Sequence, residues 1–261
     1  QQQTRETAEG VAFLQTALGS LMLRKNDPAA AAEWYSKTAV LWQRARQSAD
    51  GIPERRAYGE ALLGWGKALL LQQEMDDAET ISQKALRLFQ EQAERYRTLE
   101  CIRSYSVALN LCGRIAEAKA DYPAASRYYT VSLECRRDLL KHFTSNGGIY
   151  DCALSRMLLA QVEYLQGLNR PAKQGYDEVL QMLRPLLPKD QNQSWHLLFS
   201  QAAFERFQLD TFSGEPYLQD AIRAEAWLAE HMPGEAARTE HRNLQERYTR
   251  VHRRCYPTTR S

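Results

Sequence analysis

The sequence predicts an all-α protein, built as an α-solenoid of helix–turn–helix repeats. Two observations carry this prediction. The 261 residues contain only 13 Gly and 9 Pro, which lie between long runs free of both, and this spacing favours helices over strands. The same order of small and large residues also returns every 47 positions. A fixed period of this kind is the signature of a stacked array of repeats.

The repeat is clearest where an alanine is followed, one helical turn later, by a tyrosine or a serine. These pairs are Ala31/Tyr35, Ala78/Ser82, Ala125/Tyr129 and Ala172/Tyr176, and the residues twelve positions before the alanines are Gly19, Gly66, Gly113 and Ala160. We expect each small residue to let a neighbouring helix approach closely, and each tyrosine to fill the space beside it. Four ungapped copies therefore predict one packing arrangement used four times.

Each copy is predicted to contain two helices joined by a short turn. In the third copy, residues 99–118 are apolar at helical spacing. A turn follows, with Asp121 as the cap and Pro123 in the first turn of a second helix, which runs to about Phe143. Similar turn signals divide the chain into units of about 12–48, 54–97, 98–143, 149–187 and 193–231.

The C-terminal part of the chain is less regular. The fifth unit has Ala221 near the place of the repeated alanine and a longer turn between its helices. Residues 235–254 are charged on most faces, with Leu244, Tyr248 and Val251 as a thin apolar stripe. A solenoid needs an end cap with a polar outer face, so this segment is predicted to be a capping helix.

These units resemble the tetratricopeptide repeat. In residues 17–41 the family's packing positions are occupied by Leu18, Gly19, Ala31, Tyr35 and Thr38. The fourth copy departs from the pattern, with Ala160 in place of glycine and Val179 in place of the last small residue. The resemblance implies a right-handed α-α superhelix that forms one domain over residues 1–261. Units longer than the usual period of about 34 residues are similar to arrays in multidomain bacterial signalling proteins, so the chain is expected to be part of a longer protein.

The resemblance also implies a binding surface, because the first helices of such repeats line a concave groove. Carried across, the groove positions give the candidate partner-binding residues Ser20, Arg24, Lys67, Asn110, Arg114, Glu117, Gln161, Tyr164, Gln201 and Phe204. Lys67 and Arg114 are cations able to meet a carboxylate. Thr16 and Ser20 stand where some family members hold a peptide's C-terminal carboxylate with lysine and asparagine, so capture of that kind is not expected.

We therefore expect a protein–protein interaction module that binds a peptide, a helix or a neighbouring domain. One alternative is a solvated inner surface that binds nothing. Another is a self-assembling homo-oligomeric array, because the apolar segment 11–23 has no polar capping helix before it. A third, an enzyme with scattered catalytic residues, has no motif to support it, and neither a metal site nor a cofactor is expected.

Composition limits the other classes of function. The net charge of +2 does not argue for nucleic acid as a partner. No apolar run approaches the length of a membrane span. The cysteines (101, 112, 135, 152 and 255) are odd in number and form no C-x-x-C, which favours free thiols in a reducing, cytoplasmic compartment.

Overall fold

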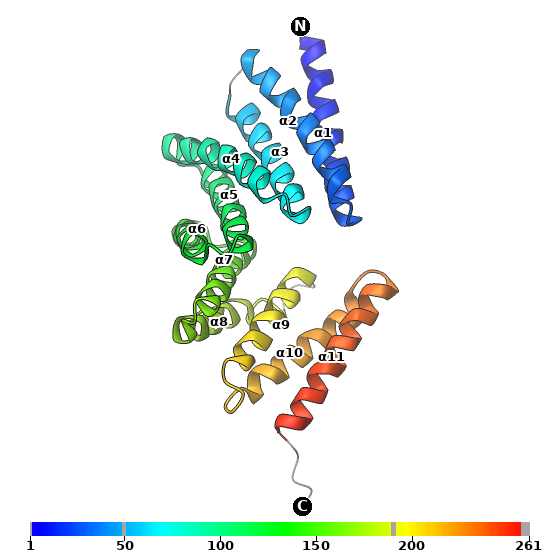
Figure 1. Cartoon of the computed structure of the whole chain (residues 1–261), viewed down its shortest axis with the longest axis vertical. Coiled ribbons are helices and arrows are strands. Elements are labelled where there is room, and N and C mark those ends of the chain that lie inside the picture. The colour runs from blue at the N-terminus through cyan, green and yellow to red at the C-terminus, as the bar shows by residue number, and fades with distance from the viewer. Residues whose placement is uncertain (1, 49–50, 189–191, 257–261) are drawn as a thin grey trace, which may run out of the picture. The chain divides into compact units, whose positions relative to one another are not determined.

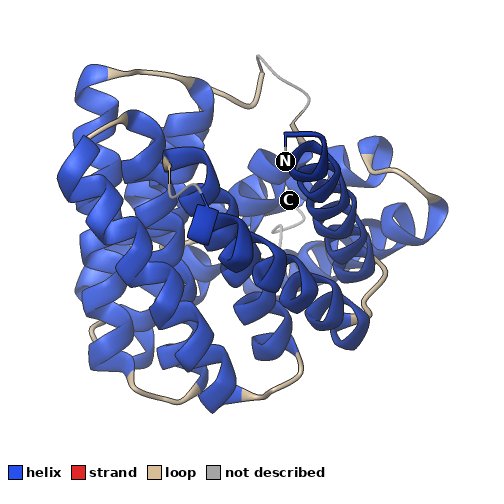
Figure 2. Cartoon of the chain, turned by 90° about the horizontal axis from the view of Figure 1, so that it is seen from above, coloured by secondary structure: helices blue, strands red, loops and turns tan. Residues whose placement is uncertain are grey.

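The computed structural model of the protein describes residues 2–48, 51–188 and 192–256. In these ranges it contains helices and no strand (Figures 1 and 2). The helices are α1 (Gln2–Arg24), α2 (Pro28–Ser48), α3 (Ile52–Leu71), α4 (Met75–Tyr96), α5 (Leu99–Ala118), α6 (Tyr122–His142), α7 (Asn146–Leu165), α8 (Asn169–Leu183), α9 (Gln193–Gln208), α10 (Glu215–His231) and α11 (Glu235–Cys255). The all-α prediction is confirmed, and consecutive helices pack in pairs as in an α-solenoid of helical repeats.

The chain forms two compact units, Gln1–Leu139 and Leu140–Ser261, and the boundary between them falls within α6. In the first unit, α2 packs on both α1 and α3, and α4 packs on both α3 and α5. In the second unit, α8 packs on α7 and α9, and α10 packs on α9 and α11. The handedness of the array and its organisation as one domain remain predictions.

The turn inside each of the first four repeats contains one residue with left-handed backbone. Asn26, Gln73, Ala120 and Gly167 all have left-handed backbone, with φ of 58°, 64°, 59° and 75°. They are 47 residues apart. In the third copy, the N–H of Asp121 donates to the carbonyl of Ala116 (2.8 Å) and the N–H of Ala120 to that of Glu117 (2.9 Å). This is the Schellman arrangement, which satisfies the last carbonyls of a helix.

The side chain of Asp121 then caps the next helix, as predicted. Its Oδ1 accepts a hydrogen bond from the N–H of Ala124 at 3.0 Å, and Asp27 does the same for Ala30 in the first copy, also at 3.0 Å. α6 begins at Tyr122, so Pro123 lies within its first turn, as predicted.

Replacing Ala120 with glycine is expected to stabilise the protein by about 1 kcal/mol, because an L-residue with a Cβ is strained in left-handed backbone. The fourth copy already has Gly167 at this place. Urea unfolding followed by circular dichroism measures the change. The matched control is Ala118→Gly in the last turn of α5, which is expected to destabilise by up to about 1 kcal/mol. A loss of stability with Ala120→Gly would contradict the prediction.

In the first unit, tyrosines of the second helices pack against glycines of the first helices, as the repeat pattern predicts. A Cβ placed on Gly19 would lie 2.9 Å from the ring of Tyr35, and one on Gly113 would overlap the ring of Tyr129. Tyr129 is completely buried. The ring of Tyr35 also occupies the space beside Gly64 of α3, so this side chain joins two successive repeats.

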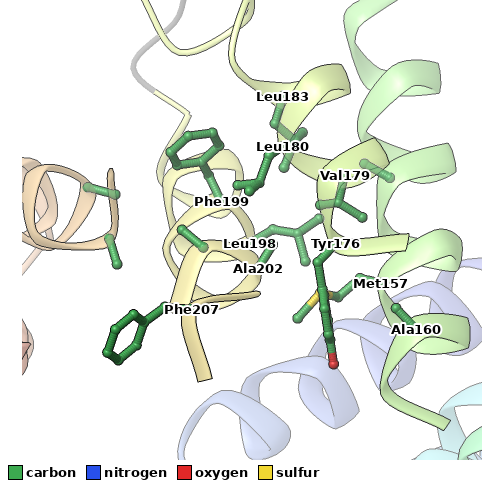
Figure 3. Close-up of a cluster of buried hydrophobic side chains, with 14 of the residues drawn as sticks. Met157, Ala160, Tyr176, Val179, Leu180, Leu183, Leu198, Phe199, Ala202 and Phe207 are labelled. Carbon is green, nitrogen blue, oxygen red and sulfur yellow. The ribbon is translucent and has the colours of Figure 1, made fainter. Parts of the chain in front are cut away.

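The second unit has its own apolar core, formed mainly by α7, α8 and α9 (Figure 3). Met157 and Ala160 of α7 meet Tyr176 and Val179 of α8, and all four side chains are buried. Figure 3 shows Leu198, Phe199 and Ala202 of α9 in the same cluster. The fourth copy thus keeps the tyrosine packing with alanine in place of glycine.

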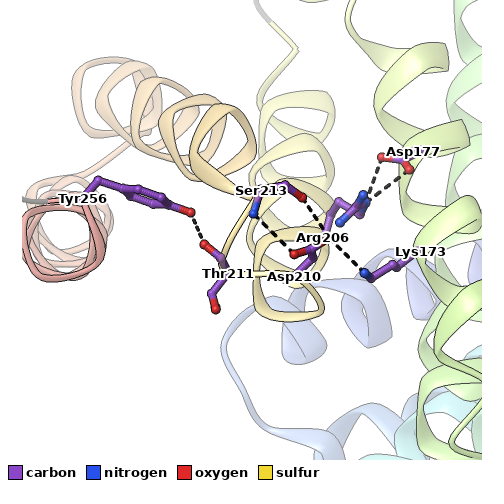
Figure 4. A network of polar contacts seen from close by, with 7 residues as sticks. All are labelled: Lys173, Asp177, Arg206, Asp210, Thr211, Ser213 and Tyr256. Carbon is purple, nitrogen blue, oxygen red and sulfur yellow. Dashed lines mark hydrogen bonds and ion pairs between the residues drawn. The ribbon is translucent and has the colours of Figure 1, made fainter.

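Polar contacts join successive repeats at the edge of this core (Figure 4). Arg206 of α9 donates from Nε to Asp177 of α8 at 3.0 Å, and its guanidinium lies 4.5 Å from the ring centroid of Tyr217. Lys173 bonds Asp210 at 3.1 Å, and the Ser213 hydroxyl bonds the same carboxylate at 2.8 Å. The Ser213 and Lys173 bonds lower the pKa of Asp210 to about 2, so its carboxylate stays ionised near neutral pH.

Candidate recognition surface

The first helices of three successive repeats lie next to one another in the first unit. α3 contacts both α1 and α5. Ser20, Lys67 and Arg114 occupy the same repeat position on these helices, 47 residues apart, and all three are exposed. Arg24, near the end of α1, is exposed as well. The structure therefore brings four of the ten predicted residues onto one face, which we call the α1–α3–α5 face.

Tyrosines of the second helices reach this face from the core. The hydroxyl of Tyr35 lies 2.9 Å from Oγ of Ser20, and the hydroxyl of Tyr129 donates to Oε2 of Glu117 at 3.0 Å. Burial, followed by the charge of Glu117, raises the pKa of Tyr129. The hydroxyl therefore stays protonated and holds the half-buried carboxylate of Glu117 in place.

Among the residues that the structure describes, the cations of the α1–α3–α5 face have no ion-pair partner. Arg24, Lys67 and Arg114 form no ion pair or hydrogen bond through their side chains within the described ranges. Arg56, on the N-terminal half of α3, differs, because it pairs with Glu100 at 2.7 Å and with Glu60 at 3.5 Å. Arg24 of α1 and Lys67 of α3 are thus unpaired cations, whereas on α5 the carboxylate of Glu117 lies about one turn from Arg114.

Not every predicted residue lies on an accessible surface. Asn110 is buried and therefore faces the core of the first unit. Gln161 and Tyr164 are on α7, the first half-buried and the second exposed, and Gln201 is exposed on α9. Phe204 is partly buried and stacks on Tyr248 of the C-terminal helix, with ring centroids 4.2 Å apart. These last four residues belong to the second unit, so one groove shared by all ten remains a prediction.

Sequence reasoning missed two apolar members of the same face. Phe13 and Val107 precede Ser20 and Arg114 by seven residues, which is about two helical turns, and they are 73% and 41% exposed. Phe13 lies 47 residues before Glu60 and Val107 lies 47 residues after it, so this shared repeat position would have identified both. The face therefore offers apolar contact as well as charge.

A buried serine, glutamate and histidine in the second unit call for comparison with catalytic triads. Ser200 donates to Oε1 of Glu225 at 2.5 Å, and Nδ1 of His241 lies 2.7 Å from Oε2 of the same carboxylate. The carboxylate stands between the other two, so the histidine cannot take the serine proton as a general base does. All three are buried, and the arrangement ties α9, α10 and α11 together.

The five cysteines are the other side chains that could be reactive, and three of them are buried. Cys101, Cys112 and Cys152 are buried free thiols, Cys135 is half-buried and Cys255 is exposed. Burial raises the pKa of Cys112 to about 12, so it stays a neutral thiol. No group of three metal-binding side chains occurs among the described residues. None of the helices in the described part of the chain is long and apolar enough to span a membrane.

No protein-family model matches the chain, and no curated protein matches its sequence. Among solved structures, the chain is similar to BtubC (BKLC) from P. vanneervenii, with a TM-score of 0.58 and 12% identity over 88% of this chain and 94% of that one. It is also similar to the S. pombe nuclear import adaptor Nro1, with a TM-score of 0.50 and 12% identity over 94% and 93% of the two chains. At this identity the likeness is one of fold alone, and it supports a tetratricopeptide-like helical-repeat fold.

Proposed function

We propose that the chain is a protein-interaction module whose α1–α3–α5 face binds an acidic segment of a protein partner. The observation that carries the proposal is the exposure of Lys67 and Arg114, one repeat apart and without an anionic partner in the described structure. A carboxylate of the partner would form charge-assisted hydrogen bonds with both cations. Solenoid repeats commonly use such extended surfaces for binding.

The spacing of the helices limits the kind of segment that fits. Neighbouring packed helices lie about 8–10 Å apart, and a polyproline II segment has three residues per turn and advances about 3.1 Å per residue. Carboxylates three residues apart in such a segment lie on one side, about 9 Å apart, and would therefore reach Lys67 and Arg114 together. Phe13 and Val107, on the same face, would contact apolar side chains between or beside the acidic ones.

The proposed partner is another protein or another domain of the same polypeptide, within a larger signalling or regulatory system of the cytoplasm. The buried free thiols suit a reducing compartment. Neither nucleic acid nor a cofactor is part of the proposal.

A peptide library displayed on phage and selected on the intact chain tests the proposal. The selected peptides are expected to be enriched in Asp and Glu at a spacing of three residues. With the best peptide as probe, Arg114→Glu is expected to weaken binding at least about 10-fold, because one attraction becomes a repulsion; this is about 1.4 kcal/mol. Fluorescence anisotropy at two salt concentrations measures the affinity.

The matched control is Lys84→Glu, which reverses an exposed cation on the second helix of the second repeat. It is expected to leave peptide affinity unchanged, and both variants are expected to keep the helical unfolding curve of the parent. Equal affinities for the parent, Lys67→Glu and Arg114→Glu would rule out the α1–α3–α5 face as the binding surface.

A further inference from the structure

Glu205 of α9 is a half-buried carboxylate in the second unit. It forms no ion pair and no hydrogen bond with any residue that the structure describes. Burial raises the pKa of its carboxyl group, because the charged form loses hydration that nothing in the described structure replaces. A carboxylate in this state lowers the stability of the fold. Its presence therefore calls for a reason other than packing.

The other repeats have small or apolar residues at this position. The counterparts of Glu205, at intervals of 47 residues, are Ala17, Gly64, Leu111 and Leu158. Leu111 is buried and belongs to the apolar core of the first unit. The fifth repeat has thus exchanged a packing residue for a charged one.

The tyrosine of the preceding repeat indicates where the Glu205 side chain lies. The ring of Tyr35 occupies the space beside Gly64, which follows it by 29 residues, and Glu205 follows Tyr176 by the same number. α8, which carries Tyr176, packs on α9. Burial, followed by the charge of Glu205, raises the pKa of Tyr176, so the carboxylate lies near this hydroxyl. Arg156 also acts on the tyrosine, but its guanidinium is bonded to two other carboxylates.

The hydroxyl of Tyr176 forms no hydrogen bond within the described ranges. The equivalent tyrosines of the first and third repeats use theirs to bond residues of the α1–α3–α5 face. In the fourth repeat the residues at those two places are Gln161 and Tyr164, and no bond to Tyr176 joins either of them there. Figure 3 shows the hydroxyl at the end of the side chain that points away from Leu180 and Leu183. A carboxylate and a hydroxyl thus lie close together, and both can accept a further hydrogen bond.

The repeat positions that hold cations in the first unit hold amides in the second. Gln161 and Gln208 occupy the places of Lys67 and Arg114. Tyr164 is 45% exposed near the end of α7, and α7 contacts α9. Amide and hydroxyl oxygens accept hydrogen bonds, and a tyrosine ring attracts a cation. The residues that we call the α7–α9 site are Gln161, Tyr164, Tyr176, Glu205 and Gln208.

We propose that the α7–α9 site binds a lysine or arginine side chain of a protein partner. The carboxylate of Glu205 accepts charge-assisted hydrogen bonds from the bound cation. The hydroxyl of Tyr176 accepts another, and the ring of Tyr164 lies against the aliphatic part or the charge of the bound side chain. A metal ion fits less well, because no group of three metal-binding side chains occurs in the described part of the chain. This site lies in the other unit from the α1–α3–α5 face and selects the opposite charge.

A phage-displayed peptide library, selected on the intact Lys67→Gln/Arg114→Gln variant, tests the site. These two changes neutralise the α1–α3–α5 face, so that acidic peptides bound there do not mask binding to the second unit. The selected peptides are expected to be enriched in Lys and Arg, and the ratio of the two shows which cation fits better. Selected peptides without enrichment in either residue would overturn the proposal.

With the best peptide as probe, Glu205→Gln is expected to weaken binding at least about 10-fold, because the cation loses its counter-charge. Tyr176→Phe removes only the hydroxyl and is expected to weaken binding about 3-fold. The matched control is Glu230→Gln, which neutralises an exposed glutamate on α10 and is expected to leave the affinity unchanged. Fluorescence anisotropy measures all three. Equal affinities of the Glu205→Gln and Glu230→Gln variants would show that the peptide binds elsewhere.

The stability of Glu205→Leu provides a second test. Leucine is the residue of the third and fourth repeats at this position, so the variant is expected to unfold at a higher urea concentration than the parent and to lose peptide binding. A structural role of the carboxylate predicts a lower urea midpoint instead, and that result would contradict the proposal. Because Glu205→Leu leaves Lys67 and Arg114 in place, failure of acidic peptides to bind the parent and failure of basic peptides to bind this site are separate results.

Discussion

Replacing Gly113 with valine is expected to destabilise the protein by about 3 kcal/mol, at the upper end of the cost of overpacking a core. Even a single Cβ at this position would overlap the ring of Tyr129. That ring cannot easily move, because it is completely buried and its hydroxyl is bonded to Glu117. Denaturant unfolding followed by circular dichroism measures the loss, as a lower midpoint with an unchanged slope.

The control is Gly147→Val, at a helical glycine with no atom within 4 Å of a Cβ, where the expected change is small. Gly113→Ala is expected to cost less than valine, because the fourth repeat already holds Ala160 against Tyr176. Combined with Tyr129→Ala, the valine should add much less than it costs alone, since the two side chains compete for one space. Strict additivity of the two changes would show that Tyr129 is not what Gly113 accommodates.

The sequence predicted this contact because each packing contact of a repeat protein recurs at a fixed interval along the sequence. Small residues at Gly19, Gly66 and Gly113 recur with partners of matching size, so one pattern identifies the contact in each copy. The turns were predictable in position for the same reason. Their left-handed residue was not, because Asn26, Gln73 and Ala120 share no feature of composition that requires such a backbone.

The candidate site was less predictable, because exposure depends on small rotations around a helix. Asn110 and Glu117 flank Arg114 by about one turn each, yet Asn110 is buried and Glu117 half-buried. Both lie at the core-facing edge of the stripe that Arg114 occupies. Phe204 is covered for another reason, since Tyr248 of α11 stacks on it from a distant part of the sequence. The position of a residue within the repeat predicts neither the burial of Asn110 and Glu117 nor the stacking of Tyr248 on Phe204.

The repeat pattern is least informative at positions where one repeat has a different type of residue from the others. Arg156 of α7 occupies the place of Leu62 and Leu109, both buried leucines of the earlier repeats. It is itself buried, and bonds Glu178 at 2.9 Å, Glu163 at 3.1 Å and the carbonyl of Pro171 at 3.2 Å. The fourth repeat has thus replaced an apolar contact with a network of charges.

Replacing Arg156 with leucine is expected to destabilise the second unit by about 3 kcal/mol, within the range found when one partner of a buried ion pair is removed. Glu163 and Glu178 would keep their charges but lose their shared cation. Urea unfolding followed by circular dichroism measures the loss.

A second change can restore what the first removes, because Arg156 is accommodated by Gly175. A Cβ on Gly175 would lie only 2.5 Å from the guanidinium carbon, whereas the same place in the second repeat is occupied by Ile81. The variant Gly175→Ile alone should therefore be strongly destabilised. In the double variant Arg156→Leu/Gly175→Ile, the leucine and isoleucine recreate the apolar pair of the second repeat. We expect the double variant to be more stable than either single variant, since each change removes the other's clash or void. A double variant less stable than both would mean that the charges of Glu163 and Glu178, rather than the space above Gly175, decide the stability of this repeat.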